Sequence, residues 1–467
     1  MLRADGGRET ATSSSTLPMD NLWGNPKHLA SLATALRKGY SEDRLHILVA
    51  ARNADSYTYD GIELGGERIT YEIEEKLEEL EKEGKKIKKL SIVGYSLGGL
   101  VARYAIGLLE NRGVFDRVEP VNFTTFATPH LGVRTPLRGP HSYLWNVLGA
   151  RTLSTSGGQL FTIDSFRDTD RPLLAVLAEP TSIFIRALRK FKHRSLYANI
   201  VNDRSAVYYT TAISATDPFV DLDAVELHPL EGYGGVILDP DNPATPKPPQ
   251  ALTLPQRLLS FSRATLSNLP LIAFLTLFIP IGSVLFLINS GVQTYRSRQR
   301  VRLHEQGKAG IGVGMYRFPL MIQEATRMYE RMGGQQTEEY LPTPPPEESE
   351  DDLDNVETPA SASASASAQI SRAPSPSAES KERLLAGGGD KAAERRVGDR
   401  GGEFPLLALT EEQFAMVRNL DAVGWRKYPV HIKKVGHTHA AIVVRMDRKS
   451  FEEGRVVIGH WVETFEV

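Results

Sequence analysis

The stretch LSIVGYSLGGLVARYAIGLLE, Leu90–Glu110, decides the fold. Its first four residues form an apolar run typical of a buried strand, and from Leu97 onward apolar residues recur at helical spacing. The pattern Gly-x-Ser-x-Gly places Ser96 where the strand turns into the helix, and glycines permit such a tight turn. We therefore predict that Ser96 is a nucleophile. A turn serine without chemistry is the alternative, because so short a pattern also arises by chance.

The flanking sequence alternates predicted strands and helices. Strands are predicted at residues 45–50, at residues 195–201 and in the first half of Val118–Arg134. Residues 69–80 carry one apolar helical face, and residues 172–192 are predicted to form two helices. This alternation predicts an α/β fold with a doubly wound, mainly parallel sheet.

A serine nucleophile needs a base to accept its proton and a carboxylate to orient that base. Asp203 directly follows the strand at 195–201, at the end of the sheet where α/β proteins bind ligands. Far downstream, GHTH contains two histidines, and the order Ser, Asp, His is that of α/β-hydrolases. We predict Ser96, Asp203 and His439 as the catalytic residues, with His437 as the alternative base. A metal site at the two histidines and two functionless loop histidines are the competing interpretations.

The oxyanion of the reaction needs two backbone N–H donors. Leu97 is predicted to supply the first and Leu22, in DNLWGNPKHL, the second. The alternative for the latter segment is an ordinary turn made by Gly24, Asn25 and Pro26. His130 precedes the acid in the chain, and we interpret it as a hydrogen-bonded loop histidine.

Composition excludes several classes of function. The 467 residues carry a net charge of −2, so no nucleic-acid partner is predicted. The chain has no cysteine, which excludes disulfides, thiolate metal sites and cysteine nucleophiles. The predicted triad needs no metal and no organic cofactor.

The segment LIAFLTLFIPIGSVLFLI, Leu271–Ile288, has no charged residue and is just long enough for a membrane helix. Pro280 interrupts it, and arginines flank both ends. A single span would separate Ser96 and Asp203 from His439, so we favour a membrane hairpin or an interfacial anchor. A true span and a buried core helix are the alternatives.

The predicted organisation has five parts. Residues 1–19 are polar, without the apolar core of a secretory signal, and are expected to be disordered. A hydrolase core is predicted at residues 20–255, followed by an apolar anchor at residues 256–334. A disordered low-complexity insert is predicted at residues 335–403, and the C-terminal part of the core at residues 404–467. In the last part, Thr410 is predicted to cap a helix, and strands are predicted at residues 428–434 and 440–445.

Six segments together resemble the fungal serine esterase and lipase family known as DUF676. They are LWGNPKHL, TYDGIELGGERI, IVGYSLGGLVARY, NFTTFATPHLGVR, YANIVNDRSAVYYTTAI and HTHAAIVVR. The likeness covers roughly residues 21–238 and 404–445 and is greatest to the phospholipase of fungal lipid droplets. It implies an α/β-hydrolase fold, hydrolysis of acyl esters in glycerophospholipids or related lipids, and the triad roles of Ser96, Asp203 and His439.

The chain departs from the family pattern in one place. The pattern has an apolar strand and a His-Gly pair before LWGN, whereas this chain has TLPMDN, with Asp20 and Asn21 at the His-Gly positions. The first core strand is therefore predicted to be missing. The main expectation is an intracellular serine lipase or phospholipase at a lipid droplet or the endoplasmic reticulum membrane. The alternative is a catalytically impaired, membrane-anchored protein that presents its disordered insert to partners.

Overall fold

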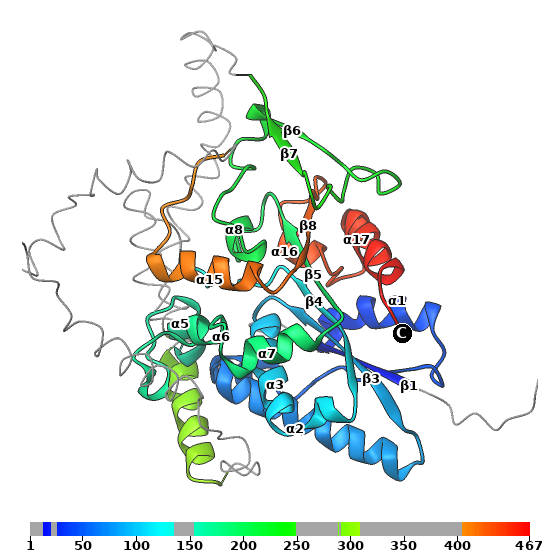
Figure 1. Ribbon diagram of the computed structural model, residues 1–467, viewed down its shortest axis with the longest axis vertical. Helices are drawn as coiled ribbons and strands as arrows, with labels where there is room; N and C mark the ends of the chain where they lie inside the picture. Colours follow the sequence, from blue (N-terminus) through cyan, green and yellow to red (C-terminus); the bar gives the residue numbers. More distant parts are fainter. Residues whose placement is uncertain (1–12, 20–25, 135–153, 249–287, 289–290, 309–403) are drawn as a thin grey trace, which may run out of the picture. The chain divides into compact units, whose positions relative to one another are not determined.

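The computed structural model describes residues 13–19, 26–134, 154–248, 288, 291–308 and 404–467. All of them belong to one compact unit. Its centre is a six-stranded sheet in the order β2-β1-β3-β4-β5-β8, with every neighbouring pair parallel (Figure 1). The predicted α/β fold with a mainly parallel sheet is confirmed. The strands are β1 (Ser13–Met19), β2 (Leu45–Ile47), β3 (Ile87–Tyr95), β4 (Glu119–Phe126), β5 (His193–Asn199) and β8 (Arg426–Val430).

The prediction that the first core strand is missing is wrong. Residues Ser13–Met19 form β1, which lies between β2 and β3 and pairs with β3 along its whole length. Its sequence SSSTLPM has no continuous apolar run, but the ladder is built from backbone N–H and C=O groups that almost any residue supplies. The predicted disorder of residues 1–19 is therefore wrong for residues 13–19, whereas residues 1–12 lie outside the described part of the chain.

Helices cover both faces of the sheet (Figure 1). The helices α2 (Ile62–Lys82), α3 (Leu97–Asn111) and α7 (Ile183–Lys190) pack on one face, and α1 (Ala30–Gly39) and α17 (Glu452–Glu463) on the other. Each face has its own apolar core. Along β3, Ile92 belongs to one core and Val93 to the other, as the two-residue period of a strand requires. Because both faces are buried, the strand can be apolar throughout.

The C-terminal segment returns to the sheet as β8, which pairs with β5. Helix α15 (Glu411–Asp421) begins with the predicted Thr410 cap: the Thr410 hydroxyl accepts the Gln413 N–H, and the Gln413 side chain accepts the Thr410 N–H. The predicted strand at residues 440–445 is wrong, because Thr438–Ala441 forms the short helix α16. Ile442 and Val443 there are fully buried, and periodicity alone cannot distinguish so short an apolar run as helix or strand.

Shorter elements complete the described chain. They are η1 (Pro26–Leu29), η2 (Asp55–Tyr59), η3 (Val114–Asp116), α5 (Ser154–Leu160), η4 (Arg167–Thr169), α6 (Leu173–Leu177), α8 (Tyr208–Thr211), η5 (Leu222–Ala224), the antiparallel pair β6 (Val225–Leu227) and β7 (Ala244–Pro246), the helix of residues 291–305, and η6 (Lys449–Phe451).

Several predicted features lie outside the described residues. These are Leu22 with its neighbours Asp20 and Asn21, the apolar segment 271–288 except for Ile288, and the low-complexity insert 335–403. Among the residues that are described, no helix combines the length and the hydropathy needed to cross a bilayer.

Candidate active site

Ser96 is the single residue between β3 and α3, and its backbone conformation is unusual. Its φ is 53° and its ψ is −127°, in a region that side-chain-bearing residues rarely occupy. The turn also brings two glycines together, since a Cβ on Gly94 would lie 2.4 Å from the Gly99 Cα. The Ser96 N–H donates to the Phe126 carbonyl at 2.9 Å, which ties the turn to β4. This is the geometry of a nucleophile elbow.

The structure brings Ser96, Asp203 and His439 together from three distant parts of the sequence. His439 Nε2 lies 3.0 Å from Ser96 Oγ, and His439 Nδ1 lies 2.8 Å from Asp203 Oδ2. His439 lies in α16, whereas His437 is the exposed residue that precedes this helix. Of the two histidines that sequence left open, His439 is the one between the serine and the carboxylate.

The Asp203 carboxylate is buried and held on both oxygens. The Asn199 side-chain amide donates to Oδ2 at 2.9 Å, beside the contact with His439. The backbone N–H groups of Ser205 and Ala206 donate to Oδ1 at 3.0 and 2.9 Å. A carboxylate with this many donors has a fixed orientation, so it can hold His439 in one tautomer.

Tyr95 and Asn199 were missed by sequence reasoning. The Tyr95 hydroxyl donates to the His439 carbonyl at 2.8 Å, and the two rings lie 5.2 Å apart between centroids. Tyr95 directly precedes the nucleophile on β3, and Asn199 ends β5, four residues before Asp203. Tyr95 and Asn199 end the strands that precede Ser96 and Asp203, and this position was the signal available in the sequence.

Leu97 is the first residue of α3, so its backbone N–H has no acceptor within the helix. This is the position from which we predict it to donate to the oxyanion. The other predicted donor, Leu22, lies outside the described residues.

His130 is fully buried and takes no part in this arrangement. Its Nε2 lies 3.0 Å from Thr125 Oγ1. Burial, and then the nearby charges of Arg103 and Lys427, lower the pKa of His130 well below its ordinary value, so the ring is neutral. This agrees with its interpretation as a structural histidine.

The three side chains can carry out nucleophilic acyl transfer. With Nδ1–H donated to Asp203, His439 Nε2 has a free lone pair that can accept the Ser96 hydroxyl proton. Across the described ranges, no group of three or more His, Asp or Glu side chains could hold a metal ion.

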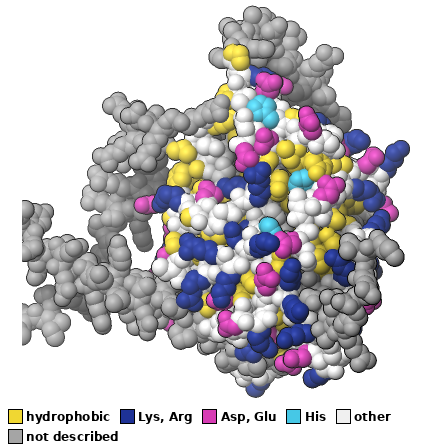
Figure 2. Space-filling model, turned by 45° about the vertical axis from the view of Figure 1, so that its right-hand side comes forward, with side chains coloured by type: hydrophobic (Ala, Val, Ile, Leu, Met, Phe, Trp, Pro, Cys, Tyr) yellow, Lys and Arg dark blue, Asp and Glu magenta, His cyan; other side chains and the backbone are white. Residues whose placement is uncertain are grey.

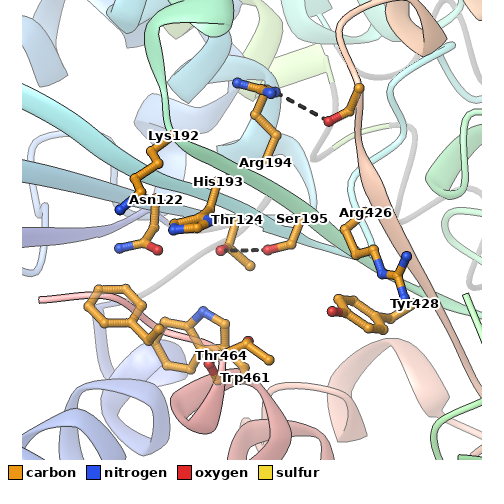
Figure 3. Close-up of a pocket in the computed structure, with 12 residues that line it drawn as sticks. Asn122, Thr124, Lys192, His193, Arg194, Ser195, Arg426, Tyr428, Trp461 and Thr464 are labelled. Carbon is orange, nitrogen blue, oxygen red and sulfur yellow. Dashed lines mark hydrogen bonds between the residues drawn. The ribbon is translucent and has the colours of Figure 1, made fainter.

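Two cavities differ in their relation to this site. A narrow pocket begins at Leu97 and Gly98 and extends between η2, α2 and α3. A cavity of about 300 Å³ lies at the other end of the sheet, near the starts of β5 and β8 (Figure 3). The rim of this second cavity carries Lys192 and His193, both paired with Glu466. Its lining residues include none of the triad, whereas Leu97, the residue after Ser96, lines the narrow pocket.

Comparison with known proteins agrees with this geometry. Residues 19–216 match the family described as "Putative serine esterase (DUF676)". The resemblance stated from the sequence is therefore confirmed over that part of the chain. The matched range contains Ser96 and Asp203, whereas His439 lies beyond it.

Curated fungal proteins are similar over parts of the chain. The Saccharomyces cerevisiae "Putative lipase YDL109C" is 35% identical over 133 residues, which is 28% of this chain and 20% of that protein. "Putative lipase ROG1" of the same yeast is 31% identical over 207 residues, which is 41% of this chain and 29% of that protein. "Putative lipase C4A8.10" of Schizosaccharomyces pombe is 34% identical over 132 residues, covering 27% and 16%. The matched segments thus span less than a third of these relatives.

Proposed function

We propose that this chain is a serine ester hydrolase that cleaves acyl esters of glycerolipids with Ser96, His439 and Asp203. The observation that carries the proposal is the continuous hydrogen-bonded connection from Ser96 Oγ through the His439 ring to Asp203. The strained backbone of Ser96 adds support, because such strain concentrates at functional sites.

The geometry supports a two-step reaction. Ser96 Oγ attacks the ester carbonyl carbon while His439 Nε2 takes the hydroxyl proton, and the Leu97 N–H donates to the oxyanion. The bond to the alcohol then breaks, and His439 returns the proton to the leaving oxygen. Water next attacks the acyl group and gives its proton to His439. The acyl–serine bond breaks, the fatty acid leaves, and Ser96 regains its proton.

The names of the similar fungal proteins, all putative lipases, support a lipid ester as substrate, and a substrate panel tests this. Purified protein is assayed for fatty-acid release from phosphatidylcholine vesicles, emulsified triacylglycerol and soluble p-nitrophenyl butyrate, with Ser96→Ala as the blank. We expect release above the blank from at least one glycerolipid. Hydrolysis of the soluble ester alone would contradict the lipid assignment and leave a simple esterase.

We further propose that the protein is intracellular and attached to a lipid droplet or the endoplasmic reticulum membrane through residues 271–288. Because His439 contacts Ser96 and Asp203, the chain before and after this segment is on one side, which supports a hairpin or interfacial anchor over a single span. On the face in Figure 2, basic side chains are interspersed with acidic ones. Arg296 and Arg302 are exposed and available to anionic headgroups.

Protease protection tests this attachment. Tags are placed at both chain ends, and membranes or droplets carrying the protein are treated with protease with and without detergent. We expect both tags to be cleaved, or both to be protected, before detergent is added. Cleavage of one tag only would contradict the hairpin and the interfacial anchor.

A further inference from the structure

The helix of residues 291–305 is docked on the candidate active-site region through a buried ion-pair cluster. Asp60, which follows η2, has a fully buried carboxylate. Arg300 donates to both of its oxygens, with Nε at 3.0 and 2.9 Å and a further contact from the terminal nitrogen at 2.7 Å. Arg68 of α2 donates to the same carboxylate at 2.7 Å. Two guanidinium groups thus contact one buried carboxylate, and these contacts offset the free-energy cost of removing the carboxylate from water.

The same helix also binds the backbone of η2. Arg300 donates to the Ser56 carbonyl at 2.7 Å, and the Ser297 hydroxyl donates to the Tyr59 carbonyl at 3.1 Å. The Tyr57 ring contacts two guanidinium groups, with its centroid 5.0 Å from that of Arg300 and 4.9 Å from that of Arg68. One turn further, His304 Nε2 lies 2.5 Å from Glu67 Oε2 in α2. The helix therefore fixes the position of η2 at several points.

Residues of η2 form one wall of the narrow pocket that begins at Leu97. Tyr57 and Thr58 line this wall, and Val101 of α3 is also a lining residue of the pocket. The lining is mostly apolar, with glycines where α2 approaches. The free volume is about 20 Å³, little more than about one water-sized sphere. An acyl chain longer than a few carbons can enter only if a wall moves.

We propose that this pocket receives the acyl chain of the ester, and that Asp60 and Arg300 are positioning residues that set the acyl-chain selectivity. The proposal rests on the proposed ester hydrolysis at Ser96. The pocket adjoins the oxyanion donor, its lining suits hydrocarbon, and its width depends on where η2 sits. Arg300 holds η2 by its backbone and by Asp60, so loosening Arg300 releases the wall.

The test compares Arg300→Gln with Arg298→Gln, an exposed arginine of the same helix. For each variant, kcat/KM is measured on p-nitrophenyl butyrate and p-nitrophenyl dodecanoate. We expect Arg300→Gln to raise the dodecanoate-to-butyrate ratio by at least about fivefold, and Arg298→Gln to leave it unchanged. An unchanged ratio in a folded, active Arg300→Gln protein would overturn the proposal. Arg300→Lys, which keeps the charge but not the bidentate contact, should give an intermediate ratio.

A second measurement is independent of activity. Hydrogen exchange of the peptide covering residues 54–61 should be faster in Arg300→Gln than in wild type and in Arg298→Gln, because η2 loses its support. Equal exchange in all three proteins would also overturn the proposal. If the wild type hydrolyses no ester, the proposed function fails, while the exchange comparison still decides whether Arg300 positions η2. If Arg300→Gln does not fold, Val101→Ala, which removes two methyl groups from the pocket lining, must raise the ratio instead.

Discussion

Replacing His439 by alanine is expected to lower kcat for ester hydrolysis by about 10⁴-fold to 10⁶-fold. His439 is the side chain within hydrogen-bonding distance of both Ser96 Oγ and Asp203 Oδ2, so its loss leaves the serine without a base. The measurement is steady-state hydrolysis of p-nitrophenyl butyrate, with circular dichroism to verify folding.

His437 provides the matched control for this experiment. His437 lies two residues before His439, is exposed, and directly precedes α16. His437→Ala is expected to retain kcat within about twofold, as exposed substitutions usually do. Equal losses in the two variants, or a larger loss in His437→Ala, would show that the base has been assigned to the wrong histidine.

The second large effect is expected for Ser96→Ala, which removes the nucleophile itself. We expect kcat to fall by about 10⁶-fold, because the two-step reaction cannot begin without the serine oxygen. Ser195→Ala is a suitable control, since Ser195 lies in β5 at the start of the strand and contacts Thr124 at 2.9 Å. Residual activity of Ser96→Ala above about one part in 10³ would indicate a different nucleophile.

Much of the site was predictable from the sequence because its chemistry depends on local patterns. A strand, a glycine-rich turn and a helix around Ser96 define an elbow without reference to other parts of the chain. Asp203 was found because carboxylates after strands of a parallel sheet converge on one edge. The choice between His437 and His439 was not decided, since it depends on how α16 orients each side chain in space.

The first strand could not be predicted, because SSSTLPM contains no continuous apolar run. Strand prediction from pattern relies on side-chain burial, whereas β1 is held between β2 and β3 by backbone pairing over Ser13–Met19. Its presence removes the missing strand as a reason for expecting a catalytically impaired protein, because β1 completes the sheet beside β3.

Long-range polar contacts could not be predicted from the sequence pattern either. In the sequence, the arginines after the apolar segment were interpreted only as its flanks, yet Arg300 is paired with the buried Asp60, 240 residues earlier in the chain. No periodicity links the two positions. The support of His439 by Tyr95 also depends on tertiary geometry, because these residues are 344 positions apart in the sequence.

The central claim is that Ser96 is the activated nucleophile, and labelling with a fluorophosphonate tests it most directly. Folded wild-type protein is treated with the reagent and digested, and modified peptides are identified by mass spectrometry. We predict a covalent phosphonyl adduct on Ser96, absent in Ser96→Ala and strongly slowed in His439→Ala. Adducts on other serines with Ser96 unmodified, or no adduct on folded protein, would contradict the account.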